Sequence, residues 1–335
     1  MEPVNLKTLA KQLNISVSTV SKALRDSYEI GAETKARVVA LAKELNYHPN
    51  PYASSLRQQK SKTIAVVIPE IANNFFSLAI NGIEEIAQEK GYHVLIYLTH
   101  EDYKKEVAIA RHLASGRVDG VLMSLSSETD NQDHIHELHA KNISIVFFDR
   151  VSESLEFSNV TTDDYESGLK ATSHLIKQGC KSIAYLSVSR HLSIDKKRKE
   201  GYLAGLSKHG MAATDENLVF CGNNNEENHE KIKQLLMSED RPDGIFASVE
   251  KLAIATYNIC NELNLRVPED VKVVGFSNLE TAHILNPPLT VIRQPAYAIG
   301  RAAATILFKI LHNNNYRDER VVLNADLVER TSTAN

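Results

Sequence analysis

The chain has 335 residues, 43% of them hydrophobic and 24% charged, so it is long enough for two or more packed units and lacks the composition of a disordered protein. Its apolar runs are far shorter than the roughly 20 residues of a membrane helix, and its N-terminus has no unbroken apolar region, so we expect a cytoplasmic protein. The first 60 residues carry nine Lys and Arg against five Asp and Glu, although the net charge of the chain is −4. A basic head on an acidic body is expected if only the head contacts a polyanion.

Three short helices are predicted in the head. Asn14 tolerates the left-handed backbone that ends a first helix sharply, and Ser16 can cap a second helix with its hydroxyl. A third apolar stripe, at 38–45, predicts a helix that ends before Tyr47. The stripe of the first helix comprises Leu6, Leu9, Ala10 and Leu13. We therefore assign residues 1–49 to an all-α helix-turn-helix DNA-binding domain.

The second helix carries an unusual number of hydroxyl side chains. On a helical wheel, the apolar Val20, Ala23 and Leu24 cluster on one side, and Ser18, Ser21 and Lys22 face the other way. Small hydroxyl side chains allow a backbone to approach phosphates and base edges closely, and a lysine reaches guanine acceptors in the major groove. This pattern favours a DNA-contact surface, with a solvated serine-rich helix as the alternative.

Residues 50–60 are predicted to form a hinge helix and linker. Pro51 suits the first position of a helix, but 52–57 allow two turns at most, and so short a helix is unstable alone. A plain linker is the alternative.

From residue 61 to 335, short β-branched runs alternate with amphipathic stretches, which is typical of parallel sheets covered on both faces. The pattern recurs after about residue 161, so we predict two doubly wound α/β subdomains with crossovers near 161 and 290–325. Helices of the second half are expected near 165–178, 199–208, 229–237, 250–263 and 296–312.

A ligand cleft is expected at the carboxyl ends of these strands. Aromatic faces there can stack on sugar rings, while Asp, Arg and Asn can satisfy hydroxyls. The candidates that follow strands or open helices are Phe75, Phe76, Ser124, Ser126, Asp149, Arg150, Asp163, Arg198, Phe246, Ser277 and Asn278. Any one of them could instead be structural.

Several segments together resemble the lactose-repressor/galactose-repressor (LacI/GalR) family of bacterial transcription regulators. The resemblance covers nearly the whole chain and rests on NLKTLAKQLNISVSTVSKAL, NNFFSLAINGIEEIAQEKGY, VPEDVKVVGFSN and PPLTVIRQPAYAIGRAA, among others. It implies a periplasmic-binding-protein-like body whose effector contacts match the cleft candidates. The sequence departs from the family where Asn14 replaces a usual glycine, Gly31 a usual serine cap and Lys22 the commoner arginine.

The resemblance also assigns roles in the head and hinge. It implies base reading by Val17, Ser18 and Lys22, and phosphate contacts by Ser16, Thr19 and Ser21. In the hinge it implies that Leu56 wedges into the minor groove and kinks the duplex. We add Leu6, Asn50 and Ala53 to the predicted DNA contacts.

The expected function is a sequence-specific transcriptional regulator, a homodimeric repressor, that binds operator DNA and a small-molecule effector. A sugar or sugar derivative is favoured, and purines and phosphorylated molecules remain open. Many relatives read GFDD where this chain reads GFSN, so we expect the cleft to lose a carboxylate at Ser277 and Asn278, leaving Asp149 and Asp163 as acidic anchors. No heptad tail that could build a tetramer follows the last helix.

The sequence disfavours two other classes of protein. An enzyme is disfavoured, because the chain has no G-x-S-x-G, no glycine-rich phosphate loop and no paired metal motif, and no cofactor is expected. The histidines of HIHELH, residues 134–139, are expected on a solvated surface helix rather than at a metal. A sugar-binding transport-type protein would share the body fold, but it would need a signal peptide and no basic head.

Overall fold

The computed structural model describes residues 4–47, 61–313 and 316–334, and the chain divides into two compact units, Met1–Gln59 and Lys60–Asn335. In the described part of the chain, no helix combines the length and the apolar character needed to cross a membrane. The predicted hinge contacts Asn50, Ala53 and Leu56 lie outside the described residues.

The first unit is the predicted three-helix head, with α1 (Leu6–Leu13), α2 (Val17–Leu24) and α3 (Ala32–Glu44). Asn14 ends α1 with a φ of 52°, in the left-handed region. Ser16 begins α2, since its Oγ accepts a hydrogen bond from the backbone N–H of Thr19 at 3.0 Å. The helices enclose a small core of Leu9, Ala10, Val20, Ala23, Val38 and Ala42.

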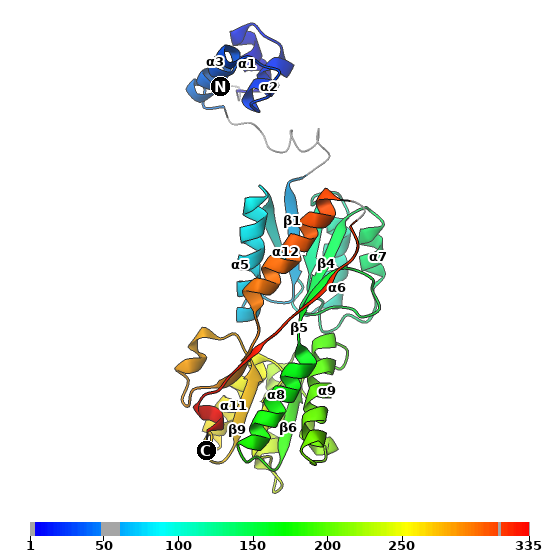
Figure 1. Cartoon of the computed structure of the whole chain (residues 1–335), viewed down its shortest axis with the longest axis vertical. Coiled ribbons are helices and arrows are strands. Elements are labelled where there is room, and N and C mark those ends of the chain that lie inside the picture. Colours follow the sequence, from blue (N-terminus) through cyan, green and yellow to red (C-terminus); the bar gives the residue numbers. More distant parts are fainter. Residues whose placement is uncertain (1–3, 48–60, 314–315, 335) are drawn as a thin grey trace. The chain divides into compact units, whose positions relative to one another are not determined.

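The second unit contains two six-stranded sheets, which confirms the predicted pair of doubly wound α/β subdomains (Figure 1). The first sheet has the order β11 (Arg320–Leu323), β5 (Asn159–Thr162), β4 (Ser144–Phe148), β3 (Gly120–Met123), β1 (Thr63–Ile68), β2 (His93–Leu98). The second has the order β12 (Asp326–Val328), β10 (Thr290–Arg293), β9 (Lys272–Phe276), β8 (Gly244–Ala247), β6 (Ile183–Ser187), β7 (Leu218–Phe220). All pairings are parallel except that of β12 with β10, which is antiparallel.

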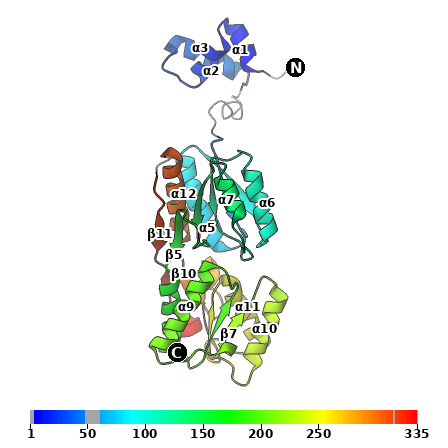
Figure 2. The ribbon, with the colours of Figure 1, turned by 90° about the vertical axis from the view of Figure 1, so that its right-hand side faces the viewer.

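Helices cover both faces of the first sheet, and together they form the first subdomain. Alternate residues of β1 separate the two cores: Ile64 and Val66 pack with α5 and α12, whereas Ala65 and Val67 pack with α6 and α7. Figure 2 shows α12 and α6 on opposite sides of this sheet. The helices are α5 (Asn74–Glu89), α6 (Tyr103–Leu113), α7 (Asp133–His139) and α12 (Ala296–His312).

The second sheet and its four helices form the second subdomain. Its two faces are covered by α8 with α9 and by α10 with α11. The chain passes between the sheets after β5, after β10 and after β11, so three segments connect the subdomains (Figure 1). The helices are α8 (Asp164–Lys177), α9 (Ser193–Lys208), α10 (Asn225–Met237) and α11 (Glu250–Glu262). Short 3-10 helices occur at Asp215–Asn217, Glu280–His283 and Thr331–Thr333.

Two helices begin earlier than predicted. The start of α9 was missed because its charged residues face inward: Asp195 is buried and accepts hydrogen bonds from the backbone N–H groups of Val188 and Ser189, each at 2.7 Å. For α10, the side chain of Asn224 caps the helix by accepting from two backbone N–H groups.

The prediction of a solvated helix at residues 134–139 is wrong in one respect. His134 is buried, and its Nε2 lies 3.0 Å from Oε1 of the equally buried Glu106. Ile135 and Leu138 of the same helix pack in the core. His134 is therefore a core residue, and among the described residues no group of acidic, His and Cys side chains could hold a metal ion.

The contact between α8 and α9 is unusually close at Gly201. A Cβ built there would lie 2.2 Å from the carbonyl oxygen of Tyr165 and 2.8 Å from the backbone nitrogen of Leu169. Because both obstacles are backbone atoms, a side chain at residue 201 would force the helices apart.

We expect Gly201→Ala to destabilise the body by about 1–3 kcal/mol or more, because overpacking must displace backbone. Thermal unfolding measures this as a lower Tm. Gly222→Ala is the matched control, since a Cβ at Gly222 meets nothing within 4 Å. Equal Tm values for the two variants would contradict the close helix contact.

Candidate functional site

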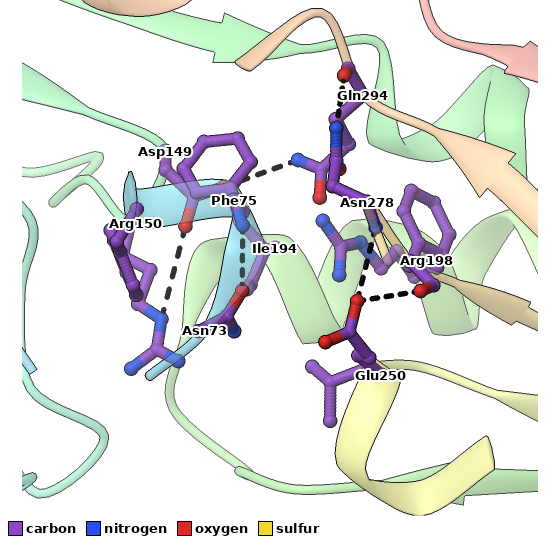
Figure 3. Close-up of a pocket in the computed structure, with 13 residues that line it drawn as sticks. Asn73, Phe75, Asp149, Arg150, Ile194, Arg198, Glu250, Asn278 and Gln294 are labelled. Carbon is purple, nitrogen blue, oxygen red and sulfur yellow. Dashed lines mark hydrogen bonds and ion pairs between the residues drawn. The ribbon is translucent and has the colours of Figure 1, made fainter. Parts of the chain in front are cut away.

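A cavity of about 30 Å³ lies between the carboxyl ends of the two sheets, where residues from both subdomains converge (Figure 3). A cavity of this size holds only one or two water molecules, so it is too small for a sugar. The first subdomain contributes residues that follow β1 and β4, and the second contributes residues from α9, α11 and the end of β9. The lining consists of Asn73, Phe75, Phe76, Asp149, Arg150, Ile194, Arg198, Val249, Glu250, Phe276, Ser277, Asn278 and Gln294.

The structure brings seven of the eleven predicted effector residues to this cavity: Phe75, Phe76, Asp149, Arg150, Arg198, Ser277 and Asn278. The other four lie elsewhere. Ser124 is buried in the first subdomain, and the hydroxyl of Ser126 donates to Thr99 at 2.7 Å. Asp163 accepts from the backbone N–H of Ala325 at 2.8 Å, and Phe246 is fully buried behind Phe276.

Sequence reasoning did not select six lining residues: Asn73, Ile194, Val249, Glu250, Phe276 and Gln294. The strand-end rule could have found two of them. Applied to the two residues that follow GIFAS, it selects Val249 and Glu250 at the start of α11, whereas Phe246 lies inside β8. Ile194 was hidden because the start of α9 was not recognised.

Arg198 is the central cation of the cleft and is 2% exposed. Its Nε donates to Oδ1 of Asp164 at 2.7 Å, and its Nη1 donates to the carbonyl of Ser248 at 2.6 Å. The guanidinium also lies 3.6 Å from the ring centroid of Phe276. Burial raises the pKa of Asp164 to about 6, although the charge of Arg198 opposes that rise. These contacts fix one face of the guanidinium against the cavity.

Asp149 and Arg150 follow β4 on the opposite wall. Asp149 has a φ of 60°, a left-handed backbone that Asp and Asn tolerate better than most residues. Its Oδ1 accepts from Nε2 of Gln294 at 3.3 Å. Burial raises the pKa of Asp149, opposed by the positive charges of Arg198 and Arg150. The guanidinium of Arg150 donates to both carboxylate oxygens of Glu101, at 2.8 and 2.9 Å.

Two buried polar atoms of the lining have no hydrogen-bond partner among the described residues. They are Nε of Arg150, whose nearest carboxylate oxygen is Oδ2 of Asp149 at 3.9 Å, and Oδ1 of Asn278. A donor and an acceptor are thus left open at the cavity. Such atoms cost free energy unless a bound molecule satisfies them.

The end of β9 lacks a carboxylate, as expected, but the expected pair of acidic anchors differs in one member: Asp149 lines the cavity and Asp163 does not. Glu250 enters from α11, and its Oε2 accepts from the hydroxyl of Ser277 at 2.6 Å and from the backbone N–H of Asn278 at 3.2 Å. The sequence GFSN therefore loses an acidic residue along the strand, but a neighbouring helix supplies one in space.

Polar contacts join the two subdomains around the closed cleft. Asn74 donates to Oε1 of Glu250 at 3.0 Å, and Asn223 donates to the hydroxyl of Ser127 at 2.8 Å. These hydrogen bonds break when the cleft opens.

The predicted DNA-contact residues lie at the start and on one face of α2. Ser16, Val17 and Ser18 are exposed, with Val17 40% exposed, whereas Leu6, Thr19, Ser21 and Lys22 are half-buried. The ammonium of Lys22 forms an ion pair with Glu29, and the hydroxyl of Ser21 accepts from Arg25 at 3.2 Å. This ion pair holds the ammonium of Lys22 against α2's own domain.

Comparison with known proteins agrees with this geometry. Residues 5–50 match the profile described as bacterial regulatory proteins, lacI family, and residues 172–333 match that of a periplasmic binding protein-like domain. The chain is 30% identical to the HTH-type transcriptional regulator RegA of Clostridium saccharobutylicum over 98% of this chain and 99% of that protein. The chain belongs to the lacI family of bacterial regulatory proteins.

Among the solved structures that resemble this chain are two that cover nearly all of it. A complex of the transcriptional regulator CelR with cellobiose has a TM-score of 0.75 and 25% identity, over 98% of this chain and 99% of that one. A lac repressor dimer bound to operator and an anti-inducer has a TM-score of 0.85 and 21% identity, over 100% of both chains. The likeness to the lac repressor shows the fold alone.

Membership of the lacI family confirms the predicted fold class and the predicted DNA-binding transcriptional regulator with a ligand-binding body. It does not favour the transport-type alternative, because the profile of residues 5–50 is that of a regulatory DNA-binding head. The relatives named are transcriptional regulators.

The buried pair of Asp164 and Arg198 should make stability depend on pH. Because the pKa of Asp164 is about 6 in the folded chain and near 3.8 when exposed, the folded state binds the extra proton first as pH falls. The contribution of Asp164 to stability therefore rises as pH falls from about 7 to 5, by on the order of 1 kcal/mol.

Asp164→Asn should remove this contribution while keeping a hydrogen-bonding side chain beside Arg198. Urea unfolding of both proteins at pH 7 and pH 5 measures it, and the free energy of unfolding of the wild type should gain more on acidification than that of the variant. Identical pH dependence in the two proteins would refute the raised pKa.

Proposed function

We propose that this regulator is a homodimeric, cytoplasmic repressor whose affinity for operator DNA is changed by a sugar or sugar derivative bound in the cleft between the body subdomains. The observation that carries the proposal is the cavity itself, in which three phenylalanines lie among eight polar or charged side chains, two of them with a buried donor or acceptor that has no partner among the described residues. No catalytic step is part of the proposal.

The chemistry of the lining supports a polyhydroxylated effector. Phe75, Phe76 and Phe276 offer aromatic surface, and Asp149, Arg150, Arg198 and Asn278 offer hydrogen bonds in both directions. The related CelR was solved with cellobiose, which is a property of that protein and supports the class of ligand here. Because the closed cavity admits only water, an effector must enter an open cleft, and its differential affinity for the two states shifts their populations.

In the head, we propose that the start and exposed face of α2 read the operator. Val17, Ser18 and Lys22 are the proposed base contacts, while Ser16, Thr19 and Ser21, with Leu6, contact the backbone or support the contact. The proposal for the hinge, residues 50–60, is that Asn50 and Ala53 contact DNA and Leu56 wedges into the minor groove. Two heads on a near-palindromic site are needed, because one head reads only a few base pairs.

Exposed apolar side chains support dimerisation through the body. Strand β2 is an edge strand of the first sheet, and its Leu95 and Ile96 are 42% and 41% exposed. Unpaired edge strands with exposed apolar residues favour association with another chain. Sedimentation in the presence and absence of operator DNA tests the dimer.

The experiment that tests the function as a whole selects bound duplexes from a random pool and then screens sugars for those that alter binding. Selection of a palindromic sequence, whose binding changes with at least one sugar, is the expected result. Random-sequence binding that no sugar changes would defeat the proposal.

Asp149→Asn should abolish or strongly weaken the effector response while leaving operator binding without effector nearly unchanged. Asparagine suits the left-handed backbone at residue 149, so the variant removes the charge without straining the fold. Operator titrations with and without the selected sugar measure the response. Asp240→Asn, at an exposed position of the same body, is the control, and a normal response in Asp149→Asn would place the pocket elsewhere.

Lys22→Ala should relax the preference at one base position per half-site and cost about 1–3 kcal/mol of specific binding. Glu29→Gln should instead strengthen operator binding, because it frees Lys22 from its ion pair and removes a negative charge near DNA. The measurement is operator affinity as a function of salt and base sequence. Glu44→Gln, an exposed residue of α3 with the same charge change, controls for net charge. If Glu44→Gln raised operator affinity as much as Glu29→Gln, the ion pair with Glu29 would not restrain Lys22.

A further inference from the structure

We propose that Glu250 is the carboxylate that grips the effector, and that it restricts the effector to uncharged sugars, excluding sugar phosphates and uronic acids. The inference rests on the proposed function of the cleft and specifies its ligand. Neither the residue nor the charge class follows from GFSN, in which the end of the strand carries no acidic side chain.

Glu250 lies between two cavities. It is the first residue of α11 and lines the inner cavity of about 30 Å³. Together with Asn73 it also lines an outer cavity of about 650 Å³. Glu250 and Asn73 are therefore the lining residues that the two cavities share.

The carboxylate of Glu250 retains capacity for one more donor. A carboxylate accepts about four hydrogen bonds, two on each oxygen. Oε2 accepts from Ser277 at 2.6 Å and from the backbone N–H of Asn278 at 3.2 Å, so its capacity is used. Oε1 accepts from Asn74 at 3.0 Å, the remaining contact found for it among the described residues. A ligand hydroxyl that donates to Oε1 would complete the set.

The contacts of Glu250 hold it rigidly in place. Ser277 and Asn278 belong to the second subdomain, whereas Asn74 is the first residue of α5 in the first. Figure 3 shows Glu250 and Asn278 at the cavity. The side chain therefore spans the cleft, and a ligand bound to Oε1 contacts the residue through which the subdomains meet. This geometry couples ligand binding to closure.

The charge balance around the cavity determines the class of ligand. Both cations of the lining already have acidic partners: Arg198 is bonded to Asp164, and Arg150 to Glu101. The carboxylates of Asp149 and Glu250 remain as an excess of negative charge. An anionic ligand would be repelled in this desolvated site, whereas hydroxyl groups donate to carboxylates favourably.

The test compares neutral sugars with their acidic counterparts on the full-length protein. The probes are glucose, glucuronate and glucose 6-phosphate, then galactose with galacturonate, and cellobiose. Titration calorimetry should detect a neutral sugar that binds at least about tenfold more tightly than its acidic counterpart. The neutral sugar donates a charge-assisted hydrogen bond to Glu250, whereas the acidic sugar is repelled by the carboxylates.

Glu250→Gln should lower the affinity for that neutral sugar by about tenfold. It should also reduce the difference in affinity between the neutral and the acidic probes, because the variant loses the charge of Glu250 and keeps its shape. Asn74 can rotate its amide to face the new glutamine, so the contact across the cleft survives in the variant. Glu239→Gln, an exposed residue of the same subdomain, should bind like the wild type.

Three results would overturn the inference. A uronate or sugar phosphate that binds the wild type more tightly than its neutral counterpart would refute the charge class and leave the cleft site standing, and this result needs no variant. Wild-type affinity and discrimination in folded Glu250→Gln would remove Glu250 from the site. Absence of binding by every probe, with operator binding intact, would defeat the proposed sugar effector and this inference with it.

Discussion

The buried charge of Arg198 is the constraint around which the cleft is built. A guanidinium that is almost fully removed from water is tolerated only if its donors are satisfied, and here Asp164, the carbonyl of Ser248 and the ring of Phe276 share that task. These partners come from α8, the end of β8 and the end of β9, so one cation fixes three elements. The close contact of α8 with α9 at Gly201 brings Asp164 within reach of Arg198.

Charge pairing also explains why only weak polar contacts hold the subdomains together at the cleft. With Arg198 and Arg150 each bonded to a carboxylate, the two subdomains meet through short polar contacts such as that of Asn74 with Glu250. Hydrogen bonds of this kind contribute little net free energy, since water replaces them when the cleft opens. Separating the subdomains would therefore cost little free energy at these contacts. An effector with a modest preference for either state can therefore change their populations substantially.

The sequence predicts the architecture well where local signals and tertiary packing agree. The left-handed Asn14 and the cap at Ser16 each follow from a residue's own chemistry, and the structure has both. The start of α9 was not predicted because Asp195 and Arg198 are charged residues that face inward, so the amphipathic pattern disappears there. The prediction that His134 is solvated was wrong for a similar reason. His134 is a polar residue that faces inward, and its partner Glu106 lies 28 positions away in the chain.

The same reasoning explains how much of the cleft could be predicted. The rule that ligands bind beyond the carboxyl ends of parallel strands selected Asp149 and Arg150 after β4, and Ser277 and Asn278 after β9, all of which line the cavity. Phe246 was selected from within a strand, where its side chain belongs to the core behind the cavity. Glu250 was missed because a search for a carboxylate along β9 cannot see one that arrives from α11. The roles of these residues toward a ligand remain predictions.

In the head, small size limits what each helix can contribute alone. Its core consists of a few residues around Leu9, Val20 and Val38, and one of its cations, Lys22, is neutralised by Glu29. Phosphate contacts supply most of the affinity of such a head, and a few base contacts supply its selectivity. Discrimination between operator and other DNA then requires two heads bound together. An effector that alters the arrangement of two bodies can thus control DNA binding without touching any residue that reads DNA.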